Sequence, residues 1–195
     1  MHVATQNRAV IRLQWLTLAW ITIEFAVAAG AGIRAHSLAL AAFSGDSAIE
    51  LFSAAVVLYR FYVGDYAEKA AARIASILLY LLAGFIALSA AASLFLKISS
   101  AEGSYTGIAI LLAAAIIMPW LGRRKRDLSA KTCSKALRAD AVQSSVCAYM
   151  SWIALAGIAL NMVFHLPWID SVAALALVPL IFYEANKARK GEDCC

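Results

Sequence analysis

Charged residues are scarce in this sequence. Asp, Glu, Lys and Arg together make up 15% of the 195 residues, whereas a soluble globular domain usually carries about 25%. Hydrophobic residues make up 63%, and the mean hydropathy is +0.77. This composition excludes an ordinary soluble domain. It predicts an all-α integral membrane protein, because the apolar stretches have the length of membrane-spanning helices.

The sequence also lacks the motifs of hydrolytic enzymes. No HExxH or GxSxG motif is present, and no Ser and His residues form a convincing catalytic arrangement. We therefore expect neither enzymatic activity nor a prosthetic group. Cysteine is rare as well: Cys147 lies in an apolar stretch, and Cys133, Cys194 and Cys195 fall in segments that we expect to face the reducing cytoplasm. No disulfide framework is expected.

Apolar stretches occupy most of the chain, and most of them reach the roughly 20 residues that cross a bilayer. They are residues 13–33, 38–63, 74–96, 106–121, 139–164 and 167–183. The fourth stretch is the shortest and contains Pro119. We expect one domain of six transmembrane helices over residues 13–186, between a cytoplasmic N-terminus (1–12) and a short cytoplasmic tail (187–195). The polar and basic connection 122–137 is expected to be a flexible joint.

The basic residues of the chain fall mostly on one side of the expected membrane helices. The formal net charge is +5 and the isoelectric point is about 9.1. If the N-terminus is cytoplasmic, every Lys and Arg except Arg34 and Lys97 falls on the cytoplasmic side of the six expected helices. The positive-inside rule therefore predicts that both termini are cytoplasmic. We expect the basic run at residues 123–126 to contact lipid headgroups, and we expect no nucleic acid partner.

Asp46 and Glu50 lie one helical turn apart in the middle of the second apolar stretch. A charged side chain at the centre of a membrane helix costs roughly 2.5 to 3.5 kcal/mol of insertion free energy, so the ionised pair costs about 5 to 7 kcal/mol. The strongly apolar residues nearby return only about 3 to 5 kcal/mol in total. Such a pair predicts an ion or proton path, and its i to i+4 spacing aims both carboxyls at one spot. The alternative is a structural pair that is hydrogen-bonded to neighbouring helices.

The fifth apolar stretch offers a matching pair of polar residues. Gln143 and Cys147 are again spaced i to i+4, and on an antiparallel helix they reach the same depth as Glu50 and Asp46. Two carboxylates, an amide and a thiol suit Zn²⁺ or Cd²⁺ better than Mg²⁺ or Ca²⁺. Asp140, one turn nearer the cytoplasm, could replace Gln143 or act as an entry ligand. The alternatives are that Cys147 only packs and that Gln143 only bonds between helices.

Glu24 is a further acidic residue in the middle of an apolar stretch, the first one. Its position in the bilayer is also costly. It could belong to a proton path or hydrogen-bond to a neighbouring helix, and the sequence leaves both interpretations open.

Several short motifs resemble the transmembrane domain of the cation diffusion facilitator family. In chain order they are Ser37-Leu38-Ala39-Leu40, Asp46-x-x-x-Glu50, Leu137-Arg138-Ala139-Asp140-Ala141, Trp168-x-Asp170 and Tyr183-Glu184. The resemblance implies six helices and export of divalent metals, chiefly zinc, from the cytoplasm in exchange for protons. It also implies a homodimer, and this chain would be a short member without the cytoplasmic C-terminal domain.

The resemblance departs from the family pattern at the metal ligands. The family places His or Asp and then Asp on helix 2, which Asp46 and Glu50 fit, but it places His and then Asp on helix 5, where this chain has Gln143 and Cys147. A thiol favours softer ions such as Cd²⁺. We expect a proton-coupled exporter of Zn²⁺ or Cd²⁺ in a bacterial-type inner membrane. The alternative is a membrane metal-binding or regulatory protein that does not transport.

Overall fold

The chain forms a bundle of long α-helices. The computed structural model describes residues 2–34, 38–95 and 105–164, together with residues 175, 178, 179, 181–183, 185 and 186. The helices are α1 (His2–Arg34), α2 (Leu38–Val63), α3 (Glu68–Phe95), α4 (Tyr105–Thr132) and α5 (Lys135–Phe164), with a short 3₁₀ helix at Asp65–Ala67. Within these described ranges no residue is in a β-strand, which confirms the expected all-α class. The sixth expected helix and the tail lie largely outside the described residues, and those described there are helical.

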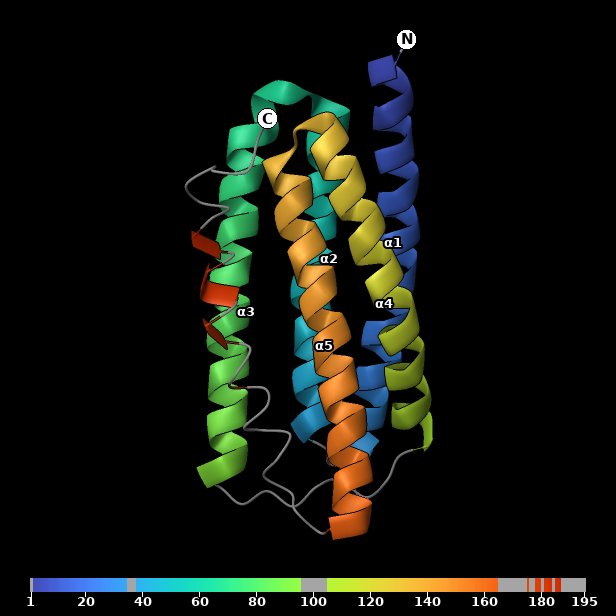
Figure 1. The fold of residues 1–195 in the computed structure, drawn as a ribbon, viewed down its shortest axis with the longest axis vertical. Helices are drawn as coiled ribbons and strands as arrows, with labels where there is room; N and C mark the ends of the chain where they lie inside the picture. Colours follow the sequence, from blue (N-terminus) through green and yellow to red (C-terminus); the bar gives the residue numbers. More distant parts are fainter. Residues whose placement is uncertain are drawn as a thin grey trace.

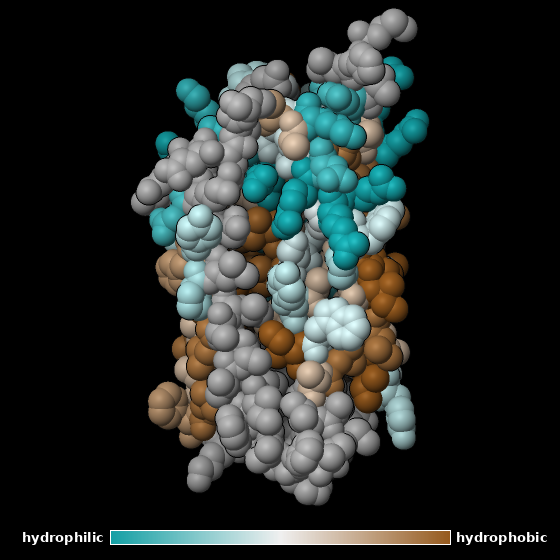
Figure 2. All heavy atoms as spheres, in the orientation of Figure 1, coloured by the Kyte–Doolittle hydropathy of each residue, from teal (hydrophilic) through white to brown (hydrophobic). Residues whose placement is uncertain are grey.

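Consecutive helices run antiparallel along the bundle (Figure 1). α5 packs against α2, α3 and α4, while α1 packs against α2 and α4. The N-terminus, the α2–α3 connection and the α4–α5 turn share one end, which we call the basic end (Figure 1). The basic end carries Arg60, Lys69, Arg73, Arg123, Arg124, Arg126, Lys131, Lys135 and Arg138. Figure 2 shows hydrophilic side chains gathered at this end and a hydrophobic band along the middle of the molecule.

The helices have the dimensions and surface of membrane spans. Among the residues that the structure describes, three helical segments are long and apolar enough to cross a bilayer: Gln6–Arg34, Glu68–Ala92 and Tyr105–Thr132. Large apolar side chains such as Leu88 and Ile116 are exposed on the outside of the bundle, as a lipid-facing surface requires. These features support the expected membrane protein, whereas six spans and cytoplasmic termini stay predictions.

The expected flexible joint at residues 122–137 is wrong. α4 continues through Pro119 and through the basic run to Thr132, and α5 begins at Lys135. The physical reason is that Arg and Lys are good helix formers, so the loss of apolar residues after position 121 ends the apolar stretch without ending the helix. The connection is therefore short, and the two helices that it joins pack against each other.

The turn between α4 and α5 is two residues long. Cys133 adopts a left-handed backbone conformation (φ 48°) that ends α4, and Ser134 caps α5 by accepting a hydrogen bond from the backbone N–H of Leu137 (3.2 Å). Cys133 is disulfide-bonded, which corrects the expectation of no disulfide. That expectation rested on the redox compartment, but a thiol exposed on a surface turn is sterically open to pairing.

Candidate functional site

All five expected ligands face the interior of the bundle. Asp46 and Glu50 lie on α2, and Asp140, Gln143 and Cys147 lie on α5, which packs directly against α2. None of these side chains is more than 1% exposed. The periodicity of both helices therefore turns their polar groups away from lipid and toward a common interior.

Two of these side chains lack hydrogen-bond partners. Both carboxylate oxygens of Asp46 and both side-chain amide atoms of Gln143 make no hydrogen bond within the described part of the chain. The second oxygen of Glu50, Oε2, is also without a hydrogen bond there. Buried polar groups are nearly always paired, because an unpaired one loses its hydration without compensation. These atoms are the ones that a bound cation could satisfy.

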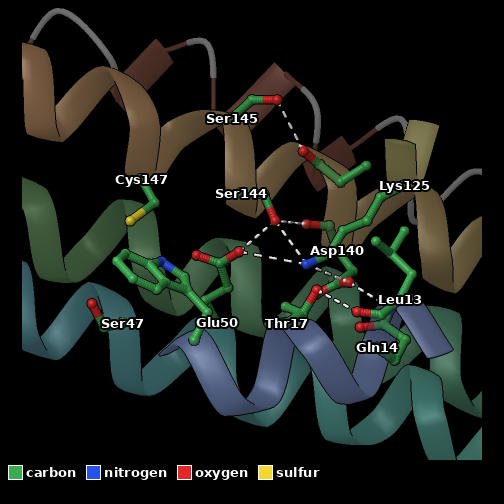
Figure 3. A network of polar contacts seen from close by, with 12 residues as sticks. Leu13, Gln14, Thr17, Ser47, Glu50, Lys125, Asp140, Ser144, Ser145 and Cys147 are labelled. Atoms are coloured by element: carbon green, nitrogen blue, oxygen red, sulfur yellow. Dashed lines mark hydrogen bonds and ion pairs between the residues drawn. The ribbon is translucent and has the colours of Figure 1, made fainter. Parts of the chain in front are cut away.

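Glu50 and Asp140 instead pair with Lys125, a residue of the basic run that was expected to contact lipid headgroups. The ammonium of Lys125 lies 2.9 Å from Asp140 Oδ2 and 3.5 Å from Glu50 Oε1. It also donates to Ser144 Oγ (2.7 Å), whose hydroxyl donates to Glu50 Oε1. Gln14 on α1 donates to the same Asp140 oxygen (2.8 Å). Figure 3 shows Lys125 reaching into this network between Asp140 and Ser144.

The burial of Lys125 corrects the expected role of the basic run. Arg123, Arg124 and Arg126 are exposed as a headgroup-facing segment should be, but Lys125 is fully buried. Helical periodicity could have predicted this burial. The buried face of α4 includes Met118, Leu121, Gly122, Lys125 and Ser129. A helix that continues past position 121 places Lys125 on that face. α4 also lies close to α5 here, since a Cβ on Gly122 would be 3.0 Å from Ser145 Oγ.

Cys147 pairs with Glu24, which brings α1 into the site. The thiol sulfur lies 3.3 Å from Glu24 Oε1. The hydroxyl of Ser47 donates to the same oxygen (2.7 Å), and the indole N–H of Trp20 donates to Glu24 Oε2 (2.8 Å). Of the two interpretations of Glu24, the structure therefore shows hydrogen bonds to neighbouring helices.

The candidate ligands on α2 and α5 are not arranged to coordinate a metal ion in this structure. Among residues that the structure describes, no group of three or more His, Cys, Asp or Glu side chains is arranged to hold a metal ion. Glu50 and Asp140 point to Lys125, and Cys147 points to Glu24. The described side chains are therefore not arranged as a four-ligand site of Asp46, Glu50, Gln143 and Cys147.

A family comparison identifies the kind of protein. Residues 65–188, more than half of the chain, match the family described as the cation efflux transmembrane domain. No curated protein matches the chain. The match begins after α2, so it contains Lys125, Asp140, Gln143 and Cys147 but neither Asp46 nor Glu50. The chain therefore belongs to the cation efflux family, and it is an integral membrane protein of the cation diffusion facilitator kind, a family of cation transporters rather than enzymes.

Proposed function

We propose that this protein exports Zn²⁺, Cd²⁺ or a similar soft divalent cation from the cytoplasm in exchange for protons. The cation binds between α2 and α5 at Asp46, Glu50, Gln143 and Cys147, and Asp140 receives it from the basic end, which faces the cytoplasm. The observation that carries this proposal is the Asp46 carboxylate, which is buried with neither oxygen hydrogen-bonded within the described residues. Such a group is costly in a membrane protein unless a cation or a proton occupies it.

The donor set supports a soft cation. Carboxylate oxygens and a thiolate in a compact arrangement favour Zn²⁺ and Cd²⁺ over the hard ions that need six or more oxygen ligands. Proton exchange follows from the same groups, because carboxylates and thiols must lose their protons to bind a metal. Release on the far side is driven by protons returning to these donors. On the family resemblance, the protein acts as a homodimer in a bacterial-type inner membrane.

Proton coupling is tested with the purified protein in liposomes. We expect influx of Zn²⁺ or Cd²⁺, followed with a trapped fluorescent indicator, to accelerate when the liposome interior is more acidic than the outside, because protons then leave as metal enters. The reason is that protonated donors release metal on the acidic side. A flux that is unchanged by the gradient, measured with an ionophore control that collapses it, contradicts the coupling.

The second candidate is a membrane metal-binding or regulatory protein that does not transport. Two observations favour it: the described residues hold no ready metal site, and Lys125 already pairs with Glu50 and Asp140. The liposome assay separates the two functions, because a regulatory protein binds metal without moving it. Binding by calorimetry together with flux at the level of empty liposomes supports the second candidate.

Gln143→His provides a gain of function under the transporter proposal. An imidazole is a much better Zn²⁺ ligand than an amide, and position 143 faces the interior with both amide atoms unbonded among described residues. We expect the affinity for Zn²⁺ to rise by about tenfold. Groups that only hydrogen-bond to metal ligands already change metal affinity by about 10- to 100-fold, so a new direct ligand should reach at least the lower value. Competition with a zinc indicator measures it. Gln143→Asn is the matched control, since it keeps an amide and adds no ligand.

A further inference from the structure

Lys125 lies where a cation would meet the carboxyls of the proposed site. We propose that its ammonium is a tethered counter-cation, which neutralises Glu50 and Asp140 in the metal-free protein and which the transported cation must displace. This inference rests on the proposed function, because it concerns how that site exchanges its cation. It assigns Lys125 a positioning and specificity role that neither the family match nor the sequence pattern gives it.

The contacts of Lys125 are those of a bound cation. Its ammonium is fully buried and is held by oxygens of Asp140 at 2.9 Å, Ser144 at 2.7 Å and Glu50 at 3.5 Å. These oxygens come from two helices, α2 and α5, while the lysine itself comes from a third, α4. A small cation is recognised by such a convergence of carboxylate and hydroxyl oxygens from several elements (Figure 3).

The charges favour exchange with a divalent ion. One ammonium faces the carboxyls of Glu50 and Asp140, and each carboxyl keeps one oxygen, Glu50 Oε2 and Asp140 Oδ1, without a hydrogen bond in the described part of the chain. Two positive charges would balance two carboxylates. A metal ion and an ammonium cannot share the same pair of oxygens, because like charges a few ångströms apart in a buried site repel strongly. Binding by Lys125 and binding by metal are therefore mutually exclusive at this pair.

The ammonium has a route by which to leave. Lys125 lies seven residues before the end of α4 at Thr132, or about 10 Å from the basic end. Its flexible four-carbon stem lets the ammonium swing toward that end, where the exposed Arg124 and Arg126 flank it on the helix. When the metal departs, the tethered ammonium returns and compensates the carboxyls. Lys125 thus lowers metal affinity and restores the empty site.

Calorimetry on the purified protein in detergent tests this exclusion, with Zn²⁺ and Cd²⁺ as the probes. We expect Lys125→Met to bind metal at least about tenfold more tightly than the unmodified chain, within the range typical of coupling between two ligands. Its flux in liposomes is expected to fall, because release no longer has the returning ammonium to assist it. Lys131→Met, which removes an exposed lysine from the same helix, is the matched control and should change neither quantity.

A second comparison keeps the test valid if Lys125→Met folds poorly. The variant Lys125→Met/Asp140→Asn removes one charge of each sign and is compared with Asp140→Asn alone. Tighter binding by the double variant supports the proposal, since Lys125 then no longer competes at Glu50. If both lysine variants bind metal no more tightly than their parent proteins, this inference alone is overturned, and Lys125 only forms a structural ion pair. Absence of metal binding in every variant and in the unmodified chain overturns the proposed function and this inference together.

Discussion

Replacing Asp46 with Asn is expected to abolish metal transport. The substitution keeps the shape of the side chain but removes its charge. It also removes one of the two carboxylate oxygens, neither of which accepts a hydrogen bond from a described residue. A direct ligand should matter more than the outer-shell groups that tune metal sites by 10- to 100-fold, so we expect flux to fall by at least about 100-fold. The measurement is the initial rate of Zn²⁺ or Cd²⁺ uptake by liposomes that contain the variant.

The stability of the Asp46→Asn protein separates a ligand from a structural residue. Because both carboxylate oxygens are buried and make no hydrogen bond with described residues, neutralising the carboxylate removes the cost of burying its charge. We expect unchanged or higher thermal stability together with lost transport. Asp127→Asn, the same chemical change at an exposed position on α4, should leave both properties unchanged. Normal flux in the Asp46 variant contradicts the proposed site.

Local sequence features were enough to predict the interior positions of four residues: Asp46, Glu50, Gln143 and Cys147. Each pair repeats with the period of a helix, and each interrupts an apolar stretch in which a polar group is costly. Those two facts require an interior-facing pair on each helix, and the structure buries all four side chains. Whether they act as ligands stays a prediction.

The pairing of these residues could not be predicted in the same way. Lys125 lies in a run of four basic residues that resembles a surface segment, and its burial depends on oxygens that two other helices, α2 and α5, supply. The partners of Glu24 also depend on how α1 packs against α2 and α5. Helix periodicity predicts which face of a helix is buried, but the partners of each buried side chain depend on how the helices pack together.

One corner of the bundle fixes α5, and with it the site. Glu68, in the first turn of α3, pairs with Arg60 near the end of α2. Its carboxylate also accepts hydrogen bonds from the backbone N–H of Ala136 (3.0 Å) and the hydroxyl of Ser134 (3.1 Å). Ser134 caps α5 and Ala136 lies in its first turn, so Glu68 supplies the negative charge that a helix N-terminus favours. The start of α5 is thereby held against α2 and α3, two turns before Gln143.

Replacing Glu68 with Ala should destabilise the protein strongly. It leaves the buried guanidinium of Arg60 without this carboxylate, and it leaves the first turn of α5 without its external acceptor. Hydrogen bonds to charged groups contribute about 1.5 to 3 kcal/mol each, and breaking a buried ion pair costs about 3 to 5 kcal/mol. Because Glu68 is 17% exposed, we expect a loss of about 3 kcal/mol in the free energy of unfolding. Denaturant titration in mixed micelles measures it.

Two further variants decide whether this corner also positions the site. Glu68→Gln keeps an acceptor oxygen and should lose less stability, whereas Lys69→Ala, at the exposed neighbouring position, should lose none. If the corner sets the position of α5, Glu68→Ala should also weaken metal binding below its unfolding temperature, because Asp140 and Gln143 shift with the helix that carries them. Reduced stability with unchanged metal affinity would show that α2 and α4 hold α5 in place without this corner.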